Sequence, residues 1–466
     1  MSLRKKFIGD KAFYKMLFLL VLPLIVQQGV TQFVSLLDNI MVGKLGTEAI
    51  NSVAIVNQLI FVFNLAIFGG ISGASIFGAQ FAGVNDHDGL RHTFRFKMLF
   101  GIAATVIAII ILIFWGDPLT MLFLENEANE GLDISLVLAN AREYLMIMLM
   151  GLFPFMVVQV YASTLREMGD TVIPMIASVA AISVNLAFNY FLIFGAFGFP
   201  RLEVKGAAIA TVLSRYVEML VVVIYTHIRK SKFIFARRAY KSLYVPFELV
   251  KKIAITGSPL MINEIVWSLG TTFINQCYST KGMYAYAATN INTTAWNLFC
   301  IIMFAMGTAI SIILGRELGK GEREKAIDLN NKLQFFNVVV HIVMGGILVL
   351  TAKYIPLLYE VEPEVREIAT SLLIVSGCAL PMHSLVHGIY FAVRSGGKTF
   401  ITFLFDSVYT WAVPAMIALC LVKFTTLGII PVYLIVQLSD ALKMTIGLIM
   451  LKSGFWANTI IEKTAE

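Results

Sequence analysis

Residues 99–115 read LFGIAATVIAIIILIFW and contain no charged side chain. Roughly 20 such residues in a helix cross the ~30 Å hydrocarbon core of a membrane. Twelve apolar stretches of this kind are centred near residues 26, 63, 104, 149, 182, 216, 265, 299, 342, 380, 411 and 440. The sequence therefore predicts an all-α polytopic membrane protein with twelve transmembrane helices.

The composition agrees with this class of protein. Hydrophobic residues make up 58% of the 466 residues and charged residues 14%, and the mean hydropathy is +0.81. Soluble domains carry about 25% charged residues. The net charge of +7 does not indicate nucleic-acid binding, because membrane proteins concentrate Lys and Arg in their cytoplasmic loops. The four cysteines lie in apolar segments without a CxxC pair, so we predict neither a disulfide nor a metal site on them.

The distribution of basic residues predicts the orientation of the chain. One side of the predicted membrane carries 26 Lys and Arg residues and the other carries 8. The basic-rich side faces the cytoplasm, so both termini are expected there, in a multi-pass protein of the inner or plasma membrane surrounded by lipid. No small-residue cleavage site follows the basic start of the chain, and we expect the first span to be retained.

An internal repeat relates the two halves of the sequence at an offset of about 236 residues in its first part. Pro23-Leu24 matches Pro259-Leu260, and Arg166-x-x-Gly169 matches Arg394-x-x-Gly397. We predict an N-lobe at 1–228 (spans 1–6), a basic cytoplasmic linker at 229–252 and a C-lobe at 253–466 (spans 7–12). Two pseudo-symmetric six-helix lobes of equal orientation suggest an alternating-access transporter, although a repeat can also serve packing alone.

Two short motifs resemble the sequence signatures of enzymes. Residues 395–399 (SGGKT) resemble the end of a phosphate-binding loop, but position 392 is alanine where a glycine is required. Residues 70–73 (GISG) match the GxSG of intramembrane proteases, yet small residues in a span normally allow close helix packing. We predict that the chain is not an enzyme and uses no cofactor.

Ionisable and amide side chains inside the spans are the candidate functional groups, because they are costly in lipid. Asp38 lies near the outer end of span 1, above Gln32. Asn185 and Asn189 share one face of span 5 at i,i+4 spacing. Converging carboxylate and amide oxygens suit a desolvated Na⁺ or a relayed proton, whereas the amides could instead bind neighbouring helices.

The second half carries Asn263 and Glu264 in span 7 and His383 and His387 on one face of span 10. Glu264 is a candidate for proton exchange or for attracting a cationic substrate, with a structural ion pair as the alternative. Two further pairs at i,i+3 spacing are expected to be structural ion pairs along their own helices. These pairs are Arg215 with Glu218 and Asp440 with Lys443.

The chain resembles the multidrug and toxic compound extrusion (MATE) family over essentially its whole length. The resemblance rests on Pro23, on Asp38-Asn39-Ile40-Met41-Val42-Gly43-x-x-Gly46, on Arg166-x-x-Gly169-Asp170-Thr171, on Asn185-x-x-x-Asn189 and on Pro259-x-x-x-Asn263-Glu264-x-x-Trp267. It implies two six-helix lobes around a central cleft. It also implies an N-lobe cation site at Asp38, Asn185, Asn189 and Thr211.

This sequence departs from the family pattern at two places. Asn189 stands where many members have a second aspartate, which puts an N-lobe proton relay in doubt. Trp267 stands where other members carry a span 7 carboxylate, and Glu264 lies on a different helix face.

The resulting functional prediction is a cation-coupled antiporter, driven by Na⁺ or H⁺, that exports amphipathic cationic small molecules by alternating access. Its coupling groups are Asp38, Asn185, Asn189, Thr211 and Glu264, with a Na⁺ at the Asp38 cluster as the sole metal considered. Its cavity is expected to include Gln32, Asn263, Trp267, His383 and His387. The alternative within the same superfamily is a flippase for lipids or lipid-linked oligosaccharides. A monomer is expected.

Overall fold

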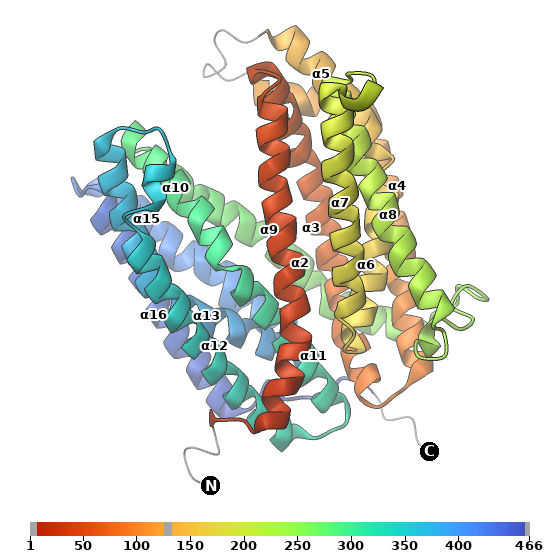
Figure 1. Ribbon diagram of the computed structural model, residues 1–466. Helices are drawn as coiled ribbons and strands as arrows, with labels where there is room; N and C mark the ends of the chain where they lie inside the picture. Colours follow the sequence, from red (N-terminus) through yellow and green to blue (C-terminus); the bar gives the residue numbers. More distant parts are fainter. Residues whose placement is uncertain (1–6, 125–132, 462–466) are drawn as a thin grey trace. The chain divides into compact units, whose positions relative to one another are not determined.

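The computed structural model describes residues 7–124 and 133–461, and within these ranges the chain is helical without a β-strand (Figure 1). The first half contains α2 (Lys11–Gly43), α3 (Thr47–Gly83), α4 (His87–Leu124), α5 (Ile134–Leu149), α6 (Leu152–Glu167), α7 (Val172–Phe194), η2 (Ala196–Gly198), α8 (Glu203–Ile228) and η3 (Ile234–Ala236). The second half contains α9 (Phe247–Ser279), α10 (Met283–Phe299), α11 (Ile301–Gly319), α12 (Arg323–Thr351), η4 (Ile355–Leu358), α13 (Pro363–Ser395), α14 (Thr399–Phe403), the π-helical turns η5 (Leu404–Val408) and η6 (Trp411–Ala415), α15 (Met416–Phe424) and α16 (Ile429–Ser453).

These helices confirm the prediction of an all-α polytopic membrane protein. Ten of the helical segments in the described ranges are long and apolar enough to cross a membrane, and α5 with α6, bent by 46°, supplies an eleventh. The remaining predicted span, centred near residue 265, is α9. It carries Lys251, Lys252 and Glu264.

Aspartate side chains begin several of the helices. Asp10 accepts a hydrogen bond from the N–H of Phe13 at 2.8 Å, next to the start of α2. Asp133 accepts one from the N–H of Leu136 at 3.1 Å, at the start of α5. A carboxylate at this position satisfies an N–H group that has no partner within the helix. The short polar connections between the apolar runs therefore fix where the helices begin.

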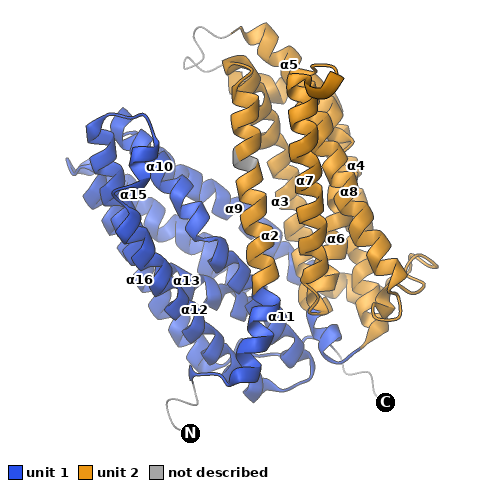
Figure 2. Cartoon of the chain, in the orientation of Figure 1, with its two compact units in different colours: residues 1–21, 79–85, 254–466 blue, residues 22–78, 86–253 orange. Residues whose placement is uncertain are grey.

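Close contacts divide the chain into two compact units (Figure 2). Unit 1 comprises residues 1–21, 79–85 and 254–466, and unit 2 comprises residues 22–78 and 86–253. The beginning of α2 belongs to unit 1, because the rings of Tyr14 and Phe18 pack against that of Phe336. The predicted lobe boundaries at 228 and 253 stay predictions.

The basic linker that follows α8 is folded onto the helices of unit 2. The guanidinium of Arg95 in α4 donates hydrogen bonds to the carbonyls of Arg238, Ala239 and Tyr244 at 3.0, 2.9 and 3.2 Å. Phe235 is fully buried and packs near the ring of Phe94, 5.2 Å between centroids. These contacts hold residues 235–244 of the linker against α4.

The ends of α3 and α11 approach each other at backbone distance within unit 1. A Cβ added at Gly319 would lie 2.1 Å from the carbonyl oxygen of Gln80, and one at Gly83 would lie 2.1 Å from that of Arg316. Only glycine leaves room for such an approach.

The segment after α16 packs around the side chain of Gln80, which is fully buried. The amide oxygen of Gln80 accepts the N–H of Ile460 at 2.8 Å. Its amide nitrogen donates to the carbonyls of Ser395 and Asn458, each at 3.2 Å. Trp456 is fully buried beside this segment. One side chain of α3 thus holds the last described residues against the end of α13.

We expect Gln80→Met to destabilise the protein by about 2 kcal/mol, because the change leaves a buried N–H and two carbonyls without partners. The measurement is thermal unfolding of the purified protein in detergent. Gln58→Met is the matched control, since Gln58 lies on the same helix and is exposed. Equal melting temperatures for the two variants would show that the Gln80 hydrogen bonds add no stability.

Candidate cation site

The structure brings Asp38 of α2 next to Asn189 of α7. The amide nitrogen of Asn189 donates a hydrogen bond to Oδ1 of Asp38 at 2.6 Å. Asn189 is 1% exposed, and Asp38 is partly buried. A carboxylate held at this depth in a membrane helix is costly unless charged or polar groups compensate for it.

The hydrogen bonds continue from Asn189 to a third helix. The same amide nitrogen of Asn189 lies 3.2 Å from Oδ1 of Asn185, one turn earlier on α7. The amide nitrogen of Asn185 lies 3.4 Å from the hydroxyl of Thr211 on α8. Four of the predicted coupling residues therefore form one chain of contacts across α2, α7 and α8.

The oxygen atoms of this cluster suit a hard cation. Oδ1 of Asn189 is buried without a hydrogen-bond partner, although an amide oxygen normally accepts two hydrogen bonds. It stands beside a carboxylate, and hard cations prefer carboxylate, amide and hydroxyl oxygens. The cluster can bind Na⁺ through these oxygens or hold a proton on Asp38. The described ranges contain no group of three His, Cys, Asp or Glu residues able to bind a metal ion.

A second polar cluster in unit 2 joins α2, α6, α7 and α8. The side chain of Gln27 accepts from Arg166 at 3.0 Å and donates to Ser178 at 2.8 Å, and Ser178 donates to Glu218 at 2.5 Å. The predicted ion pair between Glu218 and Arg215 is wrong, since Arg215 instead donates to the carbonyl of Gly151 at 3.2 Å. Contacts across helices replace the pairing along one helix.

Lys97 of α4 and Glu167 of α6 form a buried ion pair in unit 2. Nζ of Lys97 lies 2.5 Å from Oε1 of Glu167, and their side chains are 0% and 4% exposed. The hydroxyls of Ser163 and Thr164 lie 3.2 and 3.1 Å from the same nitrogen. The ammonium group is thus surrounded by oxygen atoms in place of water.

Unit 1 contains its own polar cluster, centred on Asp406. The amide nitrogen of Asn263 lies 3.1 Å from Oδ2 of Asp406, and Nζ of Lys443 lies 2.9 Å from Oδ1. Ser407 donates to the side-chain oxygen of Asn263 at 2.7 Å. Asp406 belongs to η5, and π-helical turns occur frequently at functional sites.

Asp406 is absent from the residues predicted from the sequence. The sequence could have identified it, because it is an acidic residue inside the span centred near residue 411. The predicted ion pair between Asp440 and Lys443 is also wrong, because Lys443 binds Asp406. Asp440 lies against His383 of α13, with 3.2 Å between Oδ2 and Nδ1.

Glu264 and Trp267 lie near Asn263 on α9 but take no part in its hydrogen bonds to Tyr390, Asp406 and Ser407. Glu264 is partly buried and has neither a hydrogen bond nor an ion pair among the described residues. Arg394 attracts its charge and Asp406 repels it. Trp267 is exposed to a large extent. Glu264 is therefore a carboxylate available to a ligand, as the sequence suggested, while its role stays a prediction.

The two histidines of α13 have different surroundings. His383 lies 2.9 Å from the side-chain oxygen of Gln437, and its ring meets that of Trp296 edge-on. His387 packs against the rings of Phe304 and Phe391, and its Nε2 atom has no hydrogen-bond partner. Gln32, the last predicted cavity residue, is exposed on α2 in unit 2. Their assignment to a substrate cavity stays a prediction.

Known proteins resemble this chain in sequence and in fold. The sequence model described as MatE matches residues 23–191 and 259–410. The probable multidrug resistance protein NorM of Thermotoga maritima is 25% identical over 448 residues, which cover 95% of this chain and 93% of NorM. The probable multidrug resistance protein YoeA of Bacillus subtilis is 25% identical over 425 residues, or 89% and 88% of the two chains. The bent form of VcmN, a MATE transporter of Vibrio cholerae, superposes with a TM-score of 0.84 at 17% identity, covering 95% of this chain and 97% of VcmN.

Proposed function

Because this chain belongs to the MATE family of multi-pass membrane transporters, we propose that it exports amphipathic, cationic small molecules in exchange for Na⁺ or H⁺. As a member of this family it is a transporter and has no enzymatic activity. Its bacterial relatives are named as multidrug resistance proteins, which supports drugs as the class of substrate.

The observation that carries the coupled mechanism is the chain of contacts from Asp38 to Thr211. A cation that binds there neutralises Asp38 and competes with the Asn189 amide for the carboxylate oxygen. Binding therefore changes the contact between α2 and α7. Such a change, transmitted along α2 past Pro23, alters the affinity of the transporter for the exported compound.

In the C-lobe, Glu264 attracts the positive charge of the substrate, because no cation pairs with it directly within the described residues. The neighbouring Trp267 and the rings around His383 and His387 offer aromatic faces for the apolar part of such a compound. The protein works as a monomer in the plasma membrane with both termini in the cytoplasm.

Cation influx supplies the driving force for export. One elementary charge that moves inward through 100 mV releases about 2.3 kcal/mol. This contribution vanishes when a monovalent cation exchanges for a monovalent drug, since no net charge then moves. A tenfold chemical gradient of the ion still supplies about 1.4 kcal/mol in that case.

The test is efflux of a fluorescent organic cation from proteoliposomes under an imposed Na⁺ gradient or an imposed pH gradient. We expect one of the two gradients to drive saturable export, and the other to have little effect. An efflux rate that is the same with and without each gradient would contradict antiport. Gradient-independent movement of a labelled lipid across the bilayer would indicate a flippase instead.

A further inference from the structure

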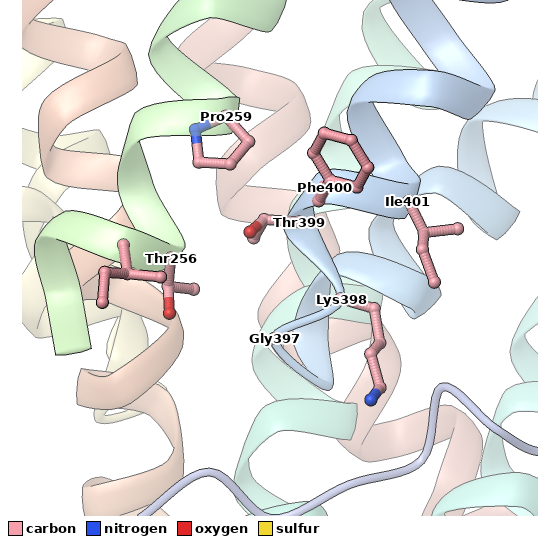
Figure 3. A pocket seen from close by; sticks show the side chains of 8 residues that line it. Thr256, Pro259, Gly397, Lys398, Thr399, Phe400 and Ile401 are labelled. Atoms are coloured by element: carbon pink, nitrogen blue, oxygen red, sulfur yellow. The ribbon is translucent and has the colours of Figure 1, made fainter.

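A cavity of about 270 Å³ lies in unit 1 between the beginning of α9 and the turn that leads from α13 into α14 (Figure 3). Its lining residues are Ile255, Thr256, Pro259, Gly397, Lys398, Thr399, Phe400 and Ile401. This volume is below the roughly 300–1,000 Å³ of pockets that enclose drug-sized ligands. The cavity therefore fits part of a larger molecule whose remainder lies outside it.

The walls of the cavity are apolar and continue onto an exposed apolar surface. Ile255 is 64% exposed and Phe400 is 62% exposed, and both side chains border the cavity. Pro259 on α9 and Ile401 on α14 complete the apolar lining (Figure 3). Phe400 and Ile401 stand in the first turn of α14, and Ile255 and Pro259 lie further along α9, so the exposed apolar side chains meet the lipid tails.

Polar groups without partners face the same cavity. Thr399 is 3% exposed, its hydroxyl points toward α9 in Figure 3, and it has no hydrogen-bond partner among the described residues. The carbonyl of Ile255 has no helical N–H donor, because residue 259 is proline. The Lys398 side chain extends away from Pro259 along the edge of the cavity. A ligand here would meet a donor hydroxyl, with a cation at the edge of the cavity.

The equivalent loop in the other half of the repeat has its charge neutralised. Asp170 there corresponds to Lys398, and Lys232 of the linker lies 2.6 Å from its Oδ2 atom. Lys398 has no acidic partner within 4.0 Å among the described residues. In the first half, Lys232 of the linker thus neutralises Asp170. In the second half, the positive charge of Lys398 stays unpaired within the described part of the chain, beside the cavity.

We propose that this cavity binds the headgroup of an anionic phospholipid from the leaflet on the predicted cytoplasmic side. Lys398 contacts the phosphate at the edge of the cavity, the Thr399 hydroxyl contacts a headgroup oxygen inside it, and the apolar walls take the first carbons of the acyl chains. Basic pockets between membrane helices on this side are suited to anionic headgroups. A lysine whose stem follows an apolar wall carries its ammonium group to the headgroup level. The site is separate from the transport cycle proposed above and does not depend on its coupling ion.

The experiment uses the full chain in nanodiscs of phosphatidylcholine and phosphatidylglycerol at a ratio of 3:1, with the lipids that remain bound counted by native mass spectrometry. We expect the wild type to retain phosphatidylglycerol in preference to phosphatidylcholine. Lys398→Gln should lower this preference about fivefold, the usual effect of one cation near an anionic surface. Thr399→Val, which keeps the shape of the side chain, should lower it as well.

Lys423→Gln is the matched control, because Lys423 lies at the other end of the same span, over the ring of Phe424. It should leave the preference unchanged. Thr256→Trp keeps every charge and fills the cavity, so it should reduce lipid retention even where Lys398 is present.

Three outcomes would overturn the proposal. Retention could be equal in Lys398→Gln, Thr399→Val and wild type, or it could fall as much in Lys423→Gln. Displacement of the lipid by millimolar inorganic phosphate would identify a site for free anions and would exclude one for lipid.

Discussion

Asp38→Asn is expected to abolish ion-driven efflux while the protein remains folded. With a tenfold ion gradient and no membrane potential, one-for-one exchange can build a substrate ratio of up to about tenfold. The variant lacks the carboxylate that a cation must neutralise, so its steady-state ratio should fall to about one. The asparagine keeps the size of the side chain and can still accept the hydrogen bond from Asn189. The measurement is the steady-state distribution of a fluorescent cation in proteoliposomes.

Asp117→Asn is the control for the loss of a carboxylate from a membrane helix. Asp117 lies on α4, has a side chain that is 44% exposed, and reaches Arg142 only at 3.8 Å, so its removal should leave efflux unchanged. Binding of the substrate, followed by fluorescence polarisation, should persist in Asp38→Asn. Efflux at the wild-type ratio in this variant would exclude Asp38 as the coupling group.

Lys97→Met is expected to lower the stability of the protein by about 3–5 kcal/mol, because it leaves the buried carboxylate of Glu167 without its cation. The double variant Lys97→Met/Glu167→Gln removes both charges and should recover a large part of this loss. The reason is that the ion pair gains little over neutral groups of similar size. Thermal unfolding in detergent and unfolding by SDS measure the two effects.

The control is an ion pair on the surface of the same unit. Lys205 and Glu143 lie 2.9 Å apart and are both about half exposed. Lys205→Met should change the stability by less than about 1 kcal/mol, as is usual for exposed pairs. A loss as large as that of Lys97→Met would mean that burial does not determine the strength of the pair at residue 97.

Helix positions were predictable from the sequence because lipid imposes a simple condition. Stretches such as residues 99–115 can satisfy their backbone only as helices that cross the membrane. The same rule does not locate polar contacts. Lys97 carries a charge near the predicted end of a span, so the sequence places it with the cytoplasmic loop, yet the structure buries it completely.

The candidate site was predictable in part for the same kind of reason. Asn185 and Asn189 share a helix face by their spacing alone, the cost of a carboxylate in lipid singled out Asp38, and the resemblance to a known family added Thr211. Spacing along one helix cannot reveal partners on another helix. The pairs at Arg215 and Lys443 were assigned wrongly for this reason, since their contacts come from Gly151 and Asp406.

The contacts of Gln80 also constrain the order in which the chain can fold during synthesis. Its partners at residues 458 and 460 are synthesised hundreds of residues after α3. Unit 2 ends at residue 253 and can complete its packing while translation continues. Unit 1 cannot, because its first and last segments must meet. Unit 1 therefore stays incomplete until residues 458 and 460 have been synthesised, and contacts of such long sequence separation form slowly.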